Sequence, residues 1–224
     1  MTRVYGRSSE SVVAWPDDAK TRETLQRYLD RLSAGSPESL MEGSLLAADG
    51  LNFAGADLSG LQLQEAALNE ADLSNVRMVE ADLYQAWMMS ANISHADLTR
   101  SDLRKIEGRG CQAANAIFRE AQLQGAVFED ADFRQADFHE ANLHDTSFAG
   151  SDLRDTDLRR CQFGWTDLSN CRIGGSNVEG ARGMILGPVD VGDQSTSILA
   201  GAPLKAWFAA HAAPDVEIHA SPQG

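Results

Sequence analysis

Residues 116–150 read AIFRE AQLQG AVFED ADFRQ ADFHE ANLHD TSFAG, which is one five-residue pattern written seven times. The third residue of each unit is Leu or Phe, and the first is Ala or Thr. The second is often Asp or Asn, and the fourth and fifth are mostly polar. The same register extends over residues 51–181, and only Gly108 and Ala113 interrupt the large third residues. About 26 units without an insertion define a repeat protein.

A five-residue period suits neither of the common regular structures. Five residues turn about 500° around an α-helix, so the large side chains would spread over every face. In a flat strand, side chains alternate every two residues. The period instead predicts a coil with straight sides of five residues. The large third residue then fills the axis, and the small first residue lies near a corner.

Units of the form A-D-L-x-x and A-x-F-x-x resemble those of the pentapeptide-repeat family. The resemblance implies four units per coil, inward-facing first and third residues, and an all-β solenoid in the form of a right-handed quadrilateral β-helix. We therefore expect an N-terminal helical cap over residues 1–50, the β-helix over 51–182, and a C-terminal segment over 183–224 with a short helix and a loose tail from about His219.

The end pieces contain three candidate helices. Residues 17–32 follow Pro16 and form an apolar stripe, with Asp17 or Asp18 as the cap. A second helix is expected through Leu40, Met41, Leu45 and Leu46, after Ser36 and Pro37. A third is expected over residues 203–212.

The third helix carries Leu204, Trp207 and Phe208 on one side. We expect this stripe to join two chains into a symmetric dimer, since two-fold pairing is the commonest way to cover such a face. The alternative is that the stripe folds back and caps the last coil.

Two places depart from the repeat. The weak units over residues 106–115 predict a bend or an outward loop, and the unbroken register favours the bend. They are also expected to be the least stable part of the solenoid. Trp87 and Met89 flank the inward Met88 and are expected on the surface. Two interpretations of that pair stay open: an interface with a partner, or packing under an end cap.

Composition excludes several classes of function. The net charge of -14 argues against direct binding to nucleic acid or to an anionic membrane and favours a basic protein surface as partner. The first residues lack a signal-peptide pattern and no segment reaches the ~20 apolar residues of a membrane span, so a cytoplasmic protein is expected.

Catalytic and metal-binding features are also missing from the sequence. Three cysteines, Cys111, Cys161 and Cys171, all occupy first positions and are expected to be small buried residues rather than disulfide or zinc ligands. His139 and His144 fall on neighbouring sides of a coil, so a shared metal is not expected. A convex solenoid offers no pocket for catalysis. We therefore expect no enzyme, no metal and no cofactor.

The charge on the repeats is uneven. Residues 51–180 contain about 21 acidic and about 11 basic residues, which is about 0.3 net charges per Å of tower against about 0.6 for duplex DNA. One side carries five acids against only Arg109, and we predict that it binds the partner. These acids are Glu70, Glu107, Glu129, Asp130 and Asp167. The opposite possibility is a solubilising surface without a partner.

The family resemblance suggests a function for this charge. Several members resemble DNA in width and charge, act on DNA gyrase and topoisomerase IV, and protect them from quinolones or natural toxins, commonly as dimers through C-terminal helices. This chain departs from them in its residues 1–50 and its modest charge density. The prediction is a non-catalytic, DNA-mimicking binder of a type II topoisomerase that gives resistance to a poison. The alternative is an interaction scaffold whose partner is unrelated to DNA topology.

Overall fold

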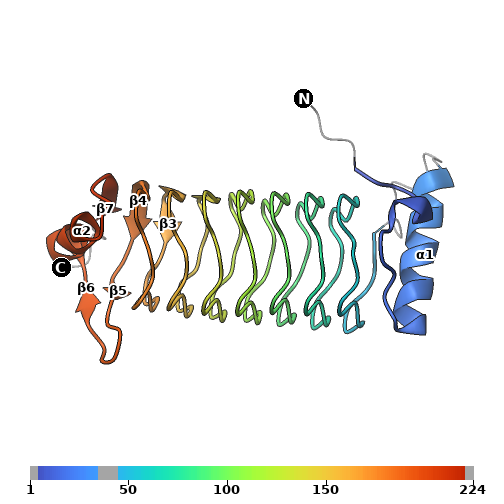
Figure 1. The fold of residues 1–224 in the computed structure, drawn as a ribbon, viewed down its shortest axis with the longest axis horizontal. Helices are drawn as coiled ribbons and strands as arrows, with labels where there is room; N and C mark the ends of the chain where they lie inside the picture. Colours follow the sequence, from blue (N-terminus) through green and yellow to red (C-terminus); the bar gives the residue numbers. More distant parts are fainter. Residues whose placement is uncertain (1–4, 35–44, 220–224) are drawn as a thin grey trace.

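The computed structural model describes residues 5–34 and 45–219, and its body is a straight tower of stacked coils (Figure 1). Residues 20 apart pair in parallel: Asn52 pairs with Asp72, and Asp72 pairs with Asn92. Four such ladders run along the tower, one for the second position of each successive unit, from Ala47 to Asp190. Each coil therefore has four sides of five residues, as the repeat predicts.

Regular elements beyond these bridges are short. The 3-10 helix η1 is Ser9–Ser11, and the helices are α1, Ala19–Ala34, and α2, Gly201–Ala210. The strands are β1 Asn142–His144, β2 Gln162–Gly164, β3 Thr166–Asp167, β4 Gly183–Leu186, β5 Val189–Asp190, β6 Ile198–Leu199 and β7 Val216–His219. β1 pairs with β2, β4 lies between β3 and β7, and β5 pairs antiparallel with β6.

The core of the tower consists of the first and third positions, which are buried along its length. In the C-terminal half the third positions form a phenylalanine cluster. Phe118 stacks on Phe138 at 4.8 Å between ring centroids, and Phe128 meets Phe133 edge-on at 5.2 Å. Ring pairs of this kind add about 0.5–1.5 kcal/mol each beyond the area that they bury.

The weak units over residues 106–115 neither bulge nor lose register. Glu107 pairs with Trp87 on one side and Val127 on the other, and Gly108 N donates to the carbonyl of Val127 at 2.8 Å. An outward loop is therefore wrong, and so is the favoured bend, because the coils pass straight through this level in Figure 1. The reason is the ring of Phe128, which fills the missing volume: a Cβ on Gly108 would lie 2.4 Å from its Cε1 atom.

Every corner of the coil is made in the same way. The fifth residue of almost every unit has a φ between about 54° and 75°, in the left-handed region. Glycine adopts this conformation freely, and Asn and Asp tolerate it better than other residues. Glu70, Asp130 and even Trp165 are held there by the two coils that flank them.

The N-terminal helix forms where the sequence predicts it. Thr21 donates from both its N–H and its Oγ1 to Asp18 Oδ2, each at 2.7 Å, and these bonds lower the pKa of Asp18. Asp18 is thus the cap residue. Leu25, Tyr28 and Leu29 are buried against the first coil. The second expected helix lies, except for Leu45 and Leu46, outside the described residues.

The N-terminal segments satisfy the free edge of the first coil. An open solenoid end exposes unpaired N–H groups that invite another chain. Here the second-position N–H group of each side finds an acceptor at 2.8–3.1 Å. The pairs are Asn52 to Thr21 Oγ1, Asp57 to the carbonyl of Ala14, Gln62 to that of Gly6, and Ala67 to that of Leu46. Residues 5–34, together with Leu46, therefore act as an edge cap.

The C-terminal helix caps the other end. Leu204 and Phe208 are fully buried, and the Phe208 ring lies 6.5 Å from that of Phe163 in the tower. Only Trp207 of the predicted dimer stripe keeps partial exposure, stacked on His211 at 4.1 Å. Leu204 and Phe208 therefore pack on the last coil, as the alternative interpretation expects, and the two-fold dimer through this helix stays a prediction.

The predicted tail also begins too early. His219 belongs to β7, which pairs in parallel with β4 over Gly183–Leu186. No repeat unit marks β7, because its partner β4 belongs to the cap rather than to a coil.

Candidate partner-binding surface

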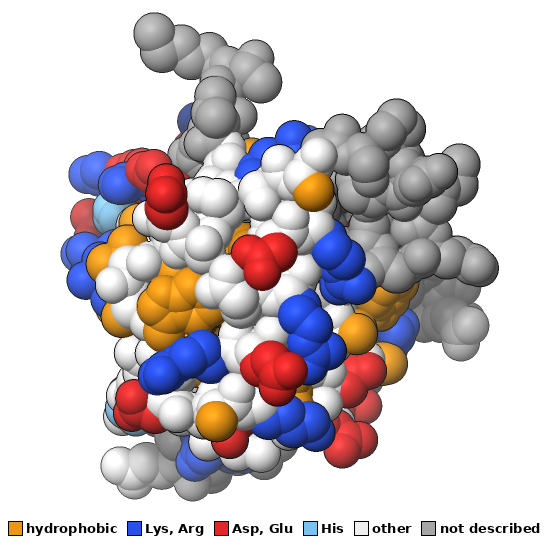
Figure 2. Space-filling view, turned by 90° about the vertical axis from the view of Figure 1, so that its right-hand side faces the viewer, with side chains coloured by type: hydrophobic (Ala, Val, Ile, Leu, Met, Phe, Trp, Pro, Cys, Tyr) orange, Lys and Arg blue, Asp and Glu red, His pale blue; other side chains and the backbone are white. Residues whose placement is uncertain are grey.

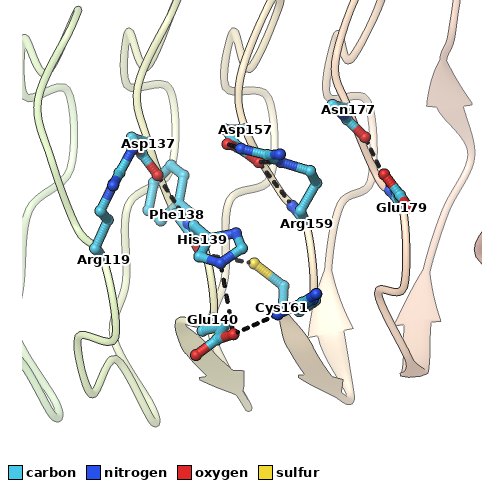
Figure 3. A network of polar contacts seen from close by, with 11 residues as sticks. Arg119, Asp137, Phe138, His139, Glu140, Asp157, Arg159, Cys161, Asn177 and Glu179 are labelled. Atoms are coloured by element: carbon cyan, nitrogen blue, oxygen red, sulfur yellow. Dashed lines mark hydrogen bonds and ion pairs between the residues drawn. The ribbon is translucent and has the colours of Figure 1, made fainter.

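The aspartates and asparagines at second positions hold the turns of the tower. In each case the side-chain Oδ1 accepts the N–H of the residue two further on, at 2.8–3.3 Å. Figure 3 shows this bond from His139 to Asp137 and from Glu179 to Asn177. Such side-chain turns are the reason Asp and Asn recur at turns. The fold therefore accounts for these aspartates without a partner.

Arginines neutralise many of the same carboxylates. Arg159 donates from Nε and Nη2 to Asp157, and Arg119 reaches Asp137 from the previous coil at 2.5 Å (Figure 3). Partial burial opposes ionisation of Asp157, but the hydrogen bonds from Arg159 outweigh it, and the pKa of Asp157 is lowered. The equivalent pairs are Arg104 with Asp102, Arg134 with Asp132, and Arg154 with Asp152.

The side that carries the five predicted acids differs, because most of its second positions hold no acid. We call this side the acidic face; it consists of the outward residues of units 66–70, 86–90, 106–110, 126–130, 146–150 and 166–170. Its second positions are Ala67, Trp87, Glu107, Val127, Ser147 and Asp167, joined in one ladder. Among them only Asp167 accepts a turn N–H, that of Ser169 at 2.8 Å.

Two of the five predicted acids share one cation. Arg109 donates to Glu107 Oε2 at 2.6 Å and to Glu129 Oε2 at 3.0 Å. Glu129 Oε1 also lies 3.3 Å from the hydroxyl of Ser147. All three charged side chains stay between about one third and one half exposed. The cluster therefore still presents one net negative charge to solvent.

Glu70 and Asp130 are the least compensated acids of the acidic face. Both are exposed at corner positions, and within residues 5–34 and 45–219 neither is joined to a cation by an ion pair. Asp130 lies over Gly150, where a Cβ would meet its Oδ1 at 2.4 Å. The fifth positions just before the face add Glu65 and Asp145, which the sequence analysis did not assign to it, and also the cation Lys105.

The exposed apolar pair lies on this same face. Trp87 is 37% exposed and Met89 is 41% exposed, in the unit between Ala67 and Glu107. The expectation that both reach the surface is confirmed. Packing under an end cap is excluded, because the pair is flanked by coils on both sides.

Other surfaces carry both signs of charge. A groove of about 650 Å³ along one corner is lined by Arg100, Glu120, Glu140, Arg160 and Arg182 among others. The N-terminal end also mixes acidic, basic and hydrophobic side chains where it is not grey in Figure 2. Within the part of the chain that the structure describes, the acidic face is thus the side where negative charge is least cancelled.

The cysteines lie inside the tower as expected. Cys161 Sγ donates to the carbonyl of Phe138 at 3.0 Å, and Cys171 Sγ to that of Phe148 at 2.8 Å. Burial raises the pKa of all three thiols, to about 12 for Cys111 and Cys171. No cluster of three or more His, Cys, Asp or Glu suited to a metal occurs among residues 5–34 and 45–219. In the same ranges no helix is both long and apolar enough to cross a membrane.

Comparison with known proteins identifies the family. The pattern described as pentapeptide repeats matches 8 copies, over residues 48–75, 66–104, 116–155 and 136–175. The chain belongs to the pentapeptide-repeat family, and its tower is a right-handed β-helix solenoid. The unmatched residues 105–115 are the weak units around Gly108, which the structure keeps in register.

Solved structures of the same kind are similar to this chain. HetL, a protein involved in heterocyst differentiation regulation in Nostoc sp. strain PCC 7120, is 22% identical with a TM-score of 0.41, covering 64% of this chain and 80% of HetL. A trypsin-treated form of QnrB1, a plasmid-mediated fluoroquinolone resistance protein, is 15% identical with a TM-score of 0.42, covering 64% and 71%. A thylakoid-lumen protein of Arabidopsis thaliana is 26% identical with a TM-score of 0.31, covering 50% and 71%. No curated protein matches.

Proposed function

We propose that this protein is a non-catalytic, DNA-mimicking binder of a type II topoisomerase such as DNA gyrase, and that it gives resistance to a topoisomerase poison. The supporting observation is the acidic face. Its acids Glu70 and Asp130 are needed neither for a turn nor for an ion pair among the described residues, whereas the second-position aspartates of other sides accept a turn N–H and several, such as Asp137 and Asp157, are also ion-paired. A basic DNA-binding surface is the complement of such a face.

The test is DNA supercoiling by purified gyrase with a quinolone present. Relief of poisoning, or inhibition of supercoiling, at micromolar protein supports the proposal. Binding should also weaken steeply with salt, because exposed charges are screened within ~8 Å at physiological ionic strength. Absence of both effects together with no complex at low salt would refute the proposal.

A matched pair of variants separates the acidic face from charge in general. The test variant is Glu70→Lys with Asp130→Lys, and the control is Glu120→Lys with Asp155→Lys. All four residues are exposed fifth positions with positive φ, and Asp130 and Asp155 each lie against a glycine of the next coil. Only the first pair lies on the acidic face. A loss of binding that is equal in both variants would assign the interaction to net charge alone.

The exposed Trp87 and Met89 favour a second candidate, an interaction scaffold whose partner does not act on DNA topology. DNA presents no apolar side chain for a mimic to copy. A complex that resists salt, forms with another protein and leaves supercoiling unchanged would support the scaffold.

A further inference from the structure

The side chain of Trp87 has no structural role that the described residues reveal. At a second position the repeat normally places Asp or Asn, which accepts the turn N–H, and Trp87 cannot do so. The turn is held instead by Met89 N donating to Asn69 Oδ1 at 3.0 Å and Ser90 N to the carbonyl of Arg109 at 2.9 Å. In residues 5–34 and 45–219 the Trp87 ring makes no stacking or cation contact, while 37% of the residue stays exposed.

The surroundings of Trp87 suit an incoming cation. Glu107 follows Trp87 in the ladder and already shares Arg109 with Glu129, whereas Glu70, at the corner of the preceding coil, has no ion pair among the described residues. The other ladder neighbour of Trp87 is Ala67, whose side chain is a single methyl group. An exposed indole beside carboxylates attracts a guanidinium more strongly than an ammonium, because the planar guanidinium can stack on the ring and pair with an oxygen at once.

The chain already binds cations to an aromatic ring one corner away. Tyr84, on the neighbouring side of the same coil, has Arg104 at 5.4 Å and Lys105 at 5.8 Å from its ring centroid. Trp87 is the next aromatic residue along this coil and is not occupied in this way within the described part of the chain.

Charge decides between the possible occupants of this surface. A second copy paired face to face would set Glu70 and Glu107 against acids of the same kind, in a chain of net charge -14. Nucleic acid and anionic lipid carry the same sign of charge and are repelled. Only a basic partner is complementary to both the ring and the carboxylates.

We propose that Trp87 and Met89 anchor an arginine-bearing basic segment of a partner protein, with a guanidinium stacked on Trp87, paired with Glu107 or Glu70, and its aliphatic stem on Met89. The inference rests on the proposed function for the sign of the partner's charge. It adds the place on the acidic face and the identity of the side chain that is recognised.

The experiment compares two synthetic peptides of equal length and charge, one with alternating Arg and Gly and the other with alternating Lys and Gly. Titration calorimetry with the full chain should show the arginine peptide binding more tightly, by at most about 2–5-fold, which is the full worth of an exposed cation–π contact. Trp87→Ala should remove this preference. The control is Trp165→Ala, since Trp165 is 53% exposed but meets the ring of His219 edge-on at 4.8 Å, and it should keep the preference.

Three results would overturn the inference: equal affinities for the two peptides, a preference that survives in Trp87→Ala, or no binding of either peptide at low salt. Melting temperatures near that of the wild type establish that both variants are folded. The test is independent of gyrase. A Trp87-dependent arginine preference without any effect on supercoiling keeps this inference and defeats the topoisomerase proposal, and the reverse outcome defeats this inference alone.

Discussion

Restoring the repeat consensus at Gly108 should weaken the protein. The third position of a unit is normally large, so Gly108→Leu would be expected from sequence to repair a defect. In the structure the space above Gly108 is already filled, because a Cβ there would lie 2.4 and 2.5 Å from two atoms of the Phe128 ring. Overpacking of this kind costs about 1–3 kcal/mol.

A compensating change should recover much of that loss. Phe128→Ala alone costs about 3–5 kcal/mol through lost burial and the cavity. In the double variant, Leu plus Ala have nearly the side-chain volume of Gly plus Phe. What remains lost are the ring contacts of Phe128 with Phe133 at 5.2 Å and with Phe148 at 6.0 Å, about 1–3 kcal/mol together. The double variant should therefore lose about 1–3 kcal/mol, against about 4–8 kcal/mol if the two effects added.

Urea unfolding of the four proteins measures this coupling. Stacked repeats can unfold in steps, so the transitions followed by circular dichroism and by tryptophan fluorescence have to coincide before the free energies of unfolding are compared. Additivity within about 0.5 kcal/mol would show that Gly108 and Phe128 do not share space. A Gly108→Leu variant that is as stable as the wild type would refute the packing argument directly.

Three other expectations follow from the contacts. Phe208→Ala should cost about 3–5 kcal/mol in thermal or urea unfolding of the C-terminal cap, because the ring is fully buried beside Phe163, while light scattering shows no change of mass. Asp82→Asn should stabilise at pH 7: burial raises the pKa of Asp82, so its penalty is full above that pKa and disappears as pH falls to ~3.9. Asp157→Asn should destabilise at pH 7 and converge with the wild type in acid, because the lowered pKa of Asp157 stabilises above ~3.9 and is lost as pH falls through the folded value. Melting temperatures of both variants and the wild type at pH 3 and pH 7 check these opposite effects. The same change in melting temperature for both variants between the two pH values would contradict them.

The sequence was sufficient for the tower because its period is carried by local chemistry. In a four-sided coil, large third residues such as Phe133 and Leu153 can be buried only at the axis, and both are buried. Asp18 and the stripe of α1 likewise identify the N-terminal cap.

Packing between coils could not be predicted from the sequence in the same way. The fit of Phe128 over Gly108 depends on residues 20 apart in different units, so a weak unit looked like a bend. The surface that covers the apolar stripe of α2 could not be predicted for a related reason. Its apolar face predicts a cover, but the sequence does not say whether the last coil or a second chain provides it.

The acidic face illustrates a general difficulty in inferring function from charge on a repeat protein. A second-position Asp such as Asp72 accepts a turn N–H at 3.0 Å, so folding alone accounts for it. Net charge then accumulates with every added coil, whether or not a partner exists. Evidence for a binding surface has to come from residues for which the fold has no use. Glu70 is such a residue, because Gly, Asn or Asp would suit its positive φ better, and Asp130 is another, because it makes neither a turn bond nor an ion pair among the described residues. Trp87 is another, because an Asp at this position would accept the turn N–H, which an indole cannot do. These three lie on one side of the tower, and the two properties together, uncompensated charge and a free indole, define what its partner must present.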